Sequence, residues 1–282
     1  MKYIISILIL LISTSSFSDD KFSEFISNLI PGEGVTESSI ELDGHDLSKD
    51  PEINILAVRD IDYSEFSNLF TQFGITSQTI GNYGREILNL GFGLRNLNQD
   101  KSLMYGLNLF WDNDFEAQHN RASIGFELKS SMLDFTANRY QALTGHQEYN
   151  GVNEQVLSGH TINLASQIPF SPWAKINWQN YTWDNEKSAE NTEGNTFAIE
   201  TYVTPSLQLI AIKDFSDNTG VDDEESYKFV YVYPPRETNS MLDGFSDLAF
   251  EKENMENKLR EKVRRENNLT VEIQGAVVVT SK

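Results

Sequence analysis

Histidines next to carboxylates are the residues of this sequence best suited to chemistry. Three histidines stand near acids of the long predicted loops: His119 with Asp112, Asp114 and Glu116, and His146 and His160 around Glu148 and Glu154. A histidine held by a carboxylate can act as a general acid or base, as in hydrolases. No activated-serine motif or metal-ligand spacing accompanies these residues. We therefore expect loop histidines, no catalytic residue and no enzyme activity.

The acidic side chains could instead bind a cation or set the type of partner. Asp222–Glu225 is a continuous acidic run, but calcium loops space their ligands, so we expect a solvated loop and neither a metal site nor a cofactor site. The chain has 42 acidic and 22 basic side chains and a net charge of −20. This balance argues against nucleic acid as a ligand, because phosphate binding needs a basic face. Without cysteine the chain has no disulfide and no thiolate chemistry.

Basic residues concentrate near the C-terminus of this acidic chain. Lys258, Arg260, Lys262, Arg264 and Arg265 lie in the second half of Phe250–Glu266, which contains neither proline nor glycine. That composition predicts a helix. Taken alone, a helix with so many charges is usually a solvated surface element.

Apolar side chains at every second position predict the elements that position these residues. Leu103, Leu107 and Trp111 share one face of their run, because successive side chains of a strand point to opposite sides. Such runs predict twelve strands: Val35–Leu42, Ile53–Asp60, Leu69–Thr76, Ile87–Arg95, Leu103–Trp111, Ala122–Lys129, Leu133–Tyr140, His160–Ile168, Ala174–Trp183, Thr196–Val203, Leu207–Asp214 and Tyr227–Tyr233. An even number fits an all-β, single-chain outer-membrane barrel with an apolar outside.

The predicted connections alternate in length. Four are short, namely Ser130-Ser131, Thr204-Pro205, Pro169–Pro172 and Asn96–Lys101. The others are long and polar: Ser77–Glu86, Asp112–Arg121, Gln141–Gly159, Asp184–Asn195 and Phe215–Ser226. Short turns on one rim and long loops on the other are typical of such barrels.

The alternative is a soluble antiparallel sandwich, which would also alternate. Its second face would carry lysine and glutamate, whereas here that face carries Asn89, Gly91, Gly93, Gly106 and Asn108. We predict that these five residues face a barrel lumen. Aromatic residues near the predicted strand ends, such as Trp111, Tyr140, Trp173, Trp183, Tyr202 and Tyr233, also favour a barrel, because amphipathic rings gather at membrane interfaces.

The N-terminus predicts export. Met1–Ser18 has a basic start, an apolar stretch and small residues before Asp19, which is typical of a cleaved signal peptide. The apolar stretch is shorter than the ~20 residues that a spanning helix needs. We expect the outer membrane of a Gram-negative bacterium, with residues 19–33 as a short periplasmic segment, 34–233 as the barrel, and 234–282 as a linker helix and a terminal strand.

Several segments in close order resemble the β-domain of the intimin/invasin inverse autotransporters. They are Leu69–Ile75, Leu88–Arg95, Met104–Phe115, Ala122–Lys129 and Ala137–Gly145, and more thinly Trp173–Tyr181, Tyr202–Phe215 and Val263–Gln274. The resemblance implies a twelve-stranded barrel in outer-membrane lipid, with both barrel ends on the periplasmic side. It further implies a C-terminal chain that passes back through the pore to a surface passenger, and assembly by the barrel-assembly machinery and periplasmic chaperones.

On that basis we expect the basic residues Lys258–Arg265 to thread the lumen and to pair with inward acids. The candidate partners are Asp112, Asp114, Asp134 and Glu200. We expect no passenger domain, because only Ala276–Thr280 resembles the start of one, and therefore no adhesive activity. The alternative is a porin-like or structural barrel with a periplasmic tail.

Overall fold

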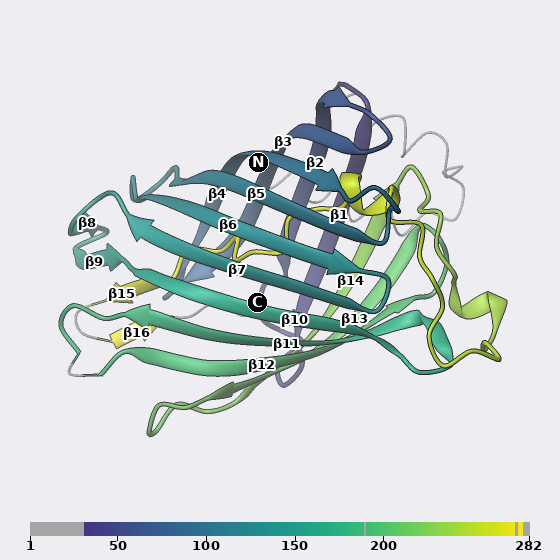
Figure 1. Cartoon of the computed structure of the whole chain (residues 1–282). Coiled ribbons are helices and arrows are strands. Elements are labelled where there is room, and N and C mark those ends of the chain that lie inside the picture. The colour runs from purple at the N-terminus through teal and green to yellow at the C-terminus, as the bar shows by residue number, and fades with distance from the viewer. Residues whose placement is uncertain (1–30, 189, 274–275, 279–282) are drawn as a thin grey trace, which may run out of the picture.

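Twelve antiparallel strands close into a barrel in the computed structural model, which describes residues 31–188, 190–273 and 276–278 (Figure 1). They are β1 (Gly34–Asp43), β2 (Glu52–Tyr63), β3 (Ser67–Ile80), β4 (Tyr83–Leu97), β5 (Leu103–Asp114), β6 (Asn120–Ser130), β7 (Leu133–Ala142), β10 (Ser158–Ile168), β11 (Ser171–Asp184), β12 (Thr192–Tyr202), β13 (Leu207–Ser216) and β14 (Glu224–Tyr233). Pairing of β1 with β14 closes the ring. The predicted twelve-stranded barrel is confirmed.

The alternation of side chains gives the barrel an apolar wall and a polar interior. In β5, Leu107 and Leu109 are each 60% exposed, whereas Asn108 is 2% exposed and Asp112 is fully buried. Asn89, Gly91 and Gly93 of β4 lie on the same buried face, as does Gly106 of β5. The five residues predicted to face the lumen are therefore all on the inner side of the wall.

The strands are longer than predicted, mainly at one end of the barrel. β3 and β4 stay paired to Ile80 and Tyr83, so a two-residue turn replaces the loop predicted at Ser77–Glu86. The polar residues there continue the ladder because its hydrogen bonds need only the backbone. We call the end with turns 64–66, 98–102, 131–132, 169–170 and 203–206 the short-turn rim, and the opposite end the long-loop rim.

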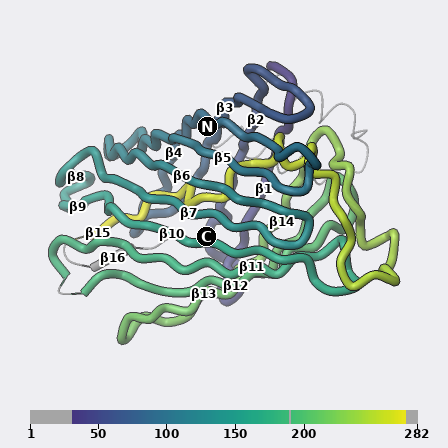
Figure 2. Tube along the Cα trace, viewed as in Figure 1, coloured from purple at the N-terminus to yellow at the C-terminus, as the bar shows by residue number. Residues whose placement is uncertain are grey.

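A second, smaller sheet lies at the long-loop rim. It contains β8 (Gln147–Tyr149), β9 (Val152–Val156), β15 (Val271–Ile273) and β16 (Ala276–Val278), in the order β16-β15-β9-β8. The sequence did not predict β8 and β9, which are short and polar. The chain reaches β15 from the short-turn rim by running through the barrel, as the yellow segment of Figure 2 shows.

The helix predicted over Phe250–Glu266 is wrong. In the described part of the tail, residues 234–273 and 276–278, the helical elements are two 3-10 turns, η1 (Met241–Asp243) and η2 (Asn257–Arg260), and the rest is irregular or extended. The length of the barrel explains why. From Lys258 to Leu269 an extended chain spans roughly 36 Å and a helix only about 17 Å, whereas the bilayer core that the barrel crosses is about 30 Å thick.

None of the helices in the described ranges has the length and apolarity needed to cross a membrane. The predicted signal peptide, Met1–Ser18, lies outside the described residues.

Some of the aromatic residues that the sequence analysis placed at the membrane interfaces lie inside the barrel instead. Trp111 is 38% exposed on the outer wall, but Tyr140 and Trp183 are fully buried and Tyr202 is 7% exposed. These three rings receive arginine side chains: Arg121 lies 4.6 Å from the ring centre of Tyr140 and 5.7 Å from that of Trp183, and Arg236 lies 5.5 Å from that of Tyr202. A flat ring holds a guanidinium by cation–π attraction, which explains their place inside the barrel.

Two lumen glycines make room for aromatic rings. A Cβ on Gly91 would lie 2.2 Å from the Phe110 ring, and one on Gly93 would lie 2.3 Å from the Phe70 ring. The same rings also contact guanidinium groups, with Arg265 4.2 Å from the centre of Phe110 and Arg95 4.4 Å from that of Phe70. Each glycine thus leaves space for a ring that also contacts an arginine in the lumen.

We expect Gly91→Ala to destabilise the barrel by about 1–3 kcal/mol, because the added methyl group must displace the packed Phe110 ring. The measurement is the urea midpoint of the purified protein in detergent. Gly84→Ala in the same strand is the control, since nothing lies within 4 Å of the added Cβ. Equal midpoints for the two variants would contradict the packing argument.

Candidate functional site in the barrel lumen

The lumen is occupied by the segment Asn257–Ile273, which we call the linker. It begins at the short-turn rim, where Asn257 donates to the carbonyl oxygen of Glu237 at 2.9 Å. It ends at the long-loop rim, where Val271 and Ile273 pair with β9. Between these points it contacts side chains from opposite walls of the barrel.

Beyond the 3-10 turn that ends at Arg260, the linker is extended, so alternate residues reach opposite walls. Arg260, Lys262 and Arg264 pair with acids on one side: Asp60 of β2 at 2.5 Å, Glu37 of β1 at 2.8 Å, and Glu200 of β12. Glu261 and Arg265 face the other side, where they pair with Lys129 of β6 at 3.2 Å and Asp112 of β5 at 2.7 Å. The spacing of two between Arg260, Lys262 and Arg264 is the period of an extended chain.

The lumen binds the linker largely through its backbone. Gln78 acts like a strand neighbour: its amide nitrogen donates to the Leu269 carbonyl at 3.0 Å and its oxygen accepts from the Leu269 N–H at 2.9 Å. Seven further wall residues bond linker backbone groups, namely Asn68, Gln72, Asn89, Arg95, Arg121, Asn138 and Tyr140. The linker inside the lumen is neither a helix nor a sheet strand, so its backbone donors and acceptors need other partners. These wall side chains supply them.

Asp112 lies at the centre of the most buried ion-pair cluster. It accepts two bonds from Arg265, at 2.9 and 2.7 Å, one from Arg121 Nε at 2.9 Å and one from Asn89 at 2.8 Å. The side chains of Asp112, Arg121 and Arg265 are all fully buried. A two-pronged arginine–carboxylate contact is strong and fixes direction as well as distance.

A second cluster holds the start of the linker. Lys258 is 1% exposed and contacts Glu253 at 2.8 Å, Glu261 at 3.2 Å and Asp134 of β7 at 3.4 Å. Three of the four candidate acids, Asp112, Asp134 and Glu200, therefore pair with linker bases. The fourth, Asp114, instead pairs with Arg85 of β4 at 2.9 Å.

Apolar linker residues occupy matching patches of the wall, which the sequence analysis missed. Val263 packs with Leu56, Val58, Phe70 and Phe110. Leu269 and Val271 pack with Ile80, Ile87 and Val156. Leu259, together with Met255 just before the linker, packs with Leu97 and Met104. Inward apolar residues in an otherwise polar lumen face are the signal that could have located these patches.

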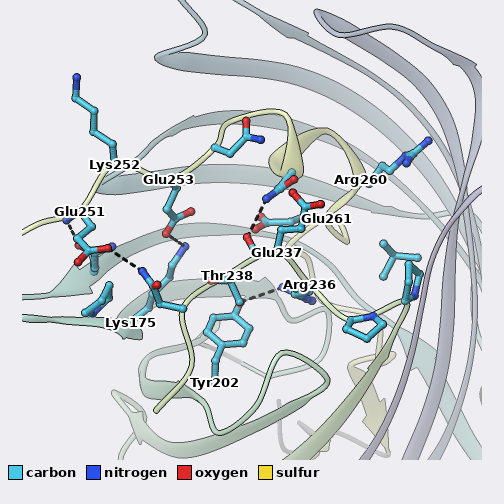
Figure 3. Close-up of a pocket in the computed structure, with 18 residues that line it drawn as sticks. Lys175, Tyr202, Arg236, Glu237, Thr238, Glu251, Lys252, Glu253, Arg260 and Glu261 are labelled. Atoms are coloured by element: carbon cyan, nitrogen blue, oxygen red, sulfur yellow. Dashed lines mark hydrogen bonds and ion pairs between the residues drawn. The ribbon is translucent and has the colours of Figure 1, made fainter. Parts of the chain in front are cut away.

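A cavity of about 490 Å³ lies beside the linker at the short-turn rim. Figure 3 shows Lys175, Arg236, Glu253 and Glu261 converging there from β11, the tail and the linker. Lys175 contacts Glu253 at 3.0 Å, and Arg236 bonds the Tyr202 hydroxyl at 2.9 Å. Lys175 of the wall and Glu253 of the tail are thus paired with one another at this cavity.

At the long-loop rim two loops hold the emerging chain. Glu272 of β15 accepts from three consecutive backbone N–H groups of the β11–β12 loop, those of Glu186 (3.0 Å), Lys187 (3.1 Å) and Ser188 (2.9 Å). Leu157 donates its N–H to the Thr270 carbonyl at 3.0 Å. Together with the β9 pairing, these bonds fix the chain as it leaves the lumen.

The histidines considered for catalysis are scattered. His119 is fully buried with its Nε2 3.7 Å from Glu154, and Arg85 contacts the same carboxylate at 2.6 Å. Burial would raise the pKa of Glu154, but His119 and Arg85 outweigh it and hold the pKa below its usual value. His146 is exposed and His160 half-buried on β10. Among the described residues no group of three or more acids or histidines could hold a metal ion.

Comparison with known proteins agrees with this architecture. Residues 27–267 match the family described as "Inverse autotransporter, beta-domain". Invasin of Yersinia enterocolitica is 27% identical over 196 residues, and an intimin of Escherichia coli O111:H- is 28% identical over 156 residues. These alignments cover 67% and 51% of this chain, but only 22% and 16% of the relatives' lengths.

A solved structure from a study of the in-meso crystallization of membrane proteins shares the fold. Its TM-score is 0.66 at 19% identity, covering 85% of this chain and all of that one. The apolar wall and the closed ring of strands place the protein in the outer membrane. The chain therefore belongs to the inverse autotransporter β-domain family.

Proposed function

We propose that the barrel anchors the chain in the outer membrane and delivers the segment after Ile273 to the cell surface. The short-turn rim faces the periplasm and the long-loop rim faces outward, as is general for outer-membrane barrels. The role needs no catalytic residue and no cofactor. Its partners are the surrounding lipid and, during assembly, the barrel-assembly machinery and periplasmic chaperones.

The way the lumen binds the linker is the observation that carries this proposal. Gln78, Gln72 and Asn138 bond the backbone of an extended chain, and such bonds form whatever side chains that chain carries. A lumen of this kind suits a polypeptide in transit. The arginine pairs with Asp112 and Glu200 then hold one particular segment in place.

The same contacts support a second role, closure of the pore. The linker fills the lumen along its length, because the side chains of Lys258, Val263 and Arg265 are all buried between the walls. A porin-like barrel with a periplasmic tail is the alternative. The pairing of β15 with β9 at the long-loop rim favours delivery to the outside over that alternative.

We expect a C-terminal epitope tag to be accessible on intact cells. Protease added outside should remove the tag without opening the outer membrane, because the linker leads the chain out through the long-loop rim. The same tag placed in the β4–β5 turn, residues 98–102 of the short-turn rim, is the control and should stay protected. A C-terminal tag that resists protease until the outer membrane is opened would favour the porin-like alternative.

A further inference from the structure

Residues 241–250 form an apolar loop that projects from the short-turn rim, which we call the rim loop. In Figure 1 it is the yellow-green segment at the right-hand end of the barrel. Its large apolar side chains are strongly exposed: Met241 53%, Leu242 77%, Phe245 78%, Leu248 63% and Phe250 41%. So many exposed apolar residues in one short segment mark a contact surface.

The rim loop is held in a defined position at the edge of the wall. The Phe170 N–H donates to the Ala249 carbonyl and the Ser246 N–H donates to the Phe170 carbonyl, both at 2.9 Å. Trp173 Nε1 donates to the Gly244 carbonyl at 2.7 Å, and the Trp173 and Phe245 rings lie 5.7 Å apart. The loop is thus tied to the β10–β11 turn mainly through backbone groups, and the Phe245 ring is still 78% exposed beside Trp173.

The apolar side chains of the rim loop continue a surface that already faces lipid. Phe170 at the tip of the β10–β11 turn is 51% exposed, and Ile176 higher in β11 is 47% exposed on the outer wall. Met132, in the neighbouring turn, is 51% exposed, and its carbonyl accepts from the Gln167 N–H at 3.2 Å. One apolar band therefore runs from the wall onto the rim loop.

We propose that the rim loop inserts into the periplasmic leaflet of the outer membrane as an interfacial anchor. Apolar and aromatic side chains next to a bilayer lower their free energy by entering the boundary between headgroups and acyl chains. The loop carries two exposed carboxylates, Asp243 and Asp247, and no basic residue, so nothing in it attracts a lipid phosphate; Asp243 accepts from Ser240 N–H and Oγ, both at 2.8 Å. The contact is therefore apolar rather than electrostatic. It fixes the point from which the tail turns back into the lumen.

Spin labels at single cysteines test this anchor, because the chain has no native cysteine. Leu242→Cys, Phe245→Cys and Leu248→Cys are made in the full chain, labelled with a nitroxide and reconstituted in phosphatidylcholine vesicles. Leu107→Cys on the outer wall is the lipid reference, and Glu237→Cys, exposed on the same tail, is the aqueous reference. Accessibility to oxygen is compared with accessibility to a water-soluble nickel chelate.

The rim-loop labels are expected to favour oxygen, as Leu107→Cys does, and this preference should not change with salt. Labels that favour the nickel chelate, as Glu237→Cys does, would overturn the anchor. Labels shielded from both reagents, or broadened by a second label, would show a protein contact and overturn it equally. Leu242→Cys and Leu248→Cys keep the test decisive if Phe245→Cys loosens the loop. Failure here leaves the tag experiment unaffected.

Discussion

Removal of residues 251–282 is expected to turn a closed barrel into an open, cation-selective channel. The linker side chains fill the lumen, so deleting them leaves a twelve-stranded ring with a water-filled interior. The deletion also removes Arg260, Lys262, Arg264 and Arg265, which neutralise wall acids. The acids that remain would attract cations, as charged rings do in channels. Planar-bilayer recordings should show discrete conductance steps that the full chain lacks.

Two further variants make this result specific. Removal of residues 279–282 alone leaves the linker intact and should leave the bilayer trace closed. Arg265→Glu places a carboxylate against Asp112 and should give brief openings even if the long deletion folds poorly. A folded deletion variant with the same closed baseline as the full chain would show that the linker is not the plug.

The barrel was predictable because its signal is repeated. Each strand places apolar residues at alternate positions, and twelve such runs were found in their correct order. Their ends were missed because residues such as Gln78 and Arg85 continue the ladder beyond the apolar part of β3 and β4. β8 and β9 were missed because they are held by distant β15 and not by a pattern of their own.

The tail shows where composition misleads. Glu, Lys and Arg favour a helix in isolation, but this segment lies inside the barrel, where the wall decides its conformation. Its wall contacts, such as Asn138 to the Arg264 carbonyl at 3.1 Å, replace the helical hydrogen bonds. The spacing of two between Arg260, Lys262 and Arg264 was the available sign of an extended chain. It can be interpreted only once the acids of the surrounding wall are known to lie beside these three residues.

The site was predictable in kind and not in detail. Strand parity places Asp112 and Asp114 on the same inner face of β5, so both were candidate partners. The sequence does not show where along the barrel axis each basic residue of the linker lies. In the structure Arg265 meets Asp112, whereas Asp114 is already paired with Arg85. Such pairings depend on register across the closed ring, which only the fold supplies.

Asp112→Ala is expected to cost about 3–5 kcal/mol of folding free energy, because it leaves two buried guanidinium groups without their carboxylate. Arg121 and Arg265 both lose a charge partner, and neither side chain can reach solvent. The free energy of unfolding from urea titration measures the effect. Asp112→Asn should cost less, since the amide oxygen can still accept hydrogen bonds.

Asp184→Ala is the matched control. Its partner Arg139 also lies 3.0 Å away, but the two side chains are 41% and 52% exposed. Loss of such a surface pair should cost about 0–1 kcal/mol. A double-mutant cycle of Asp112→Ala with Arg265→Ala then separates the linker contact from the wall contact with Arg121. A coupling energy no larger than that of the Asp184–Arg139 pair would mean that Arg265 is held by its Phe110 stacking, and that Asp112 serves the wall alone.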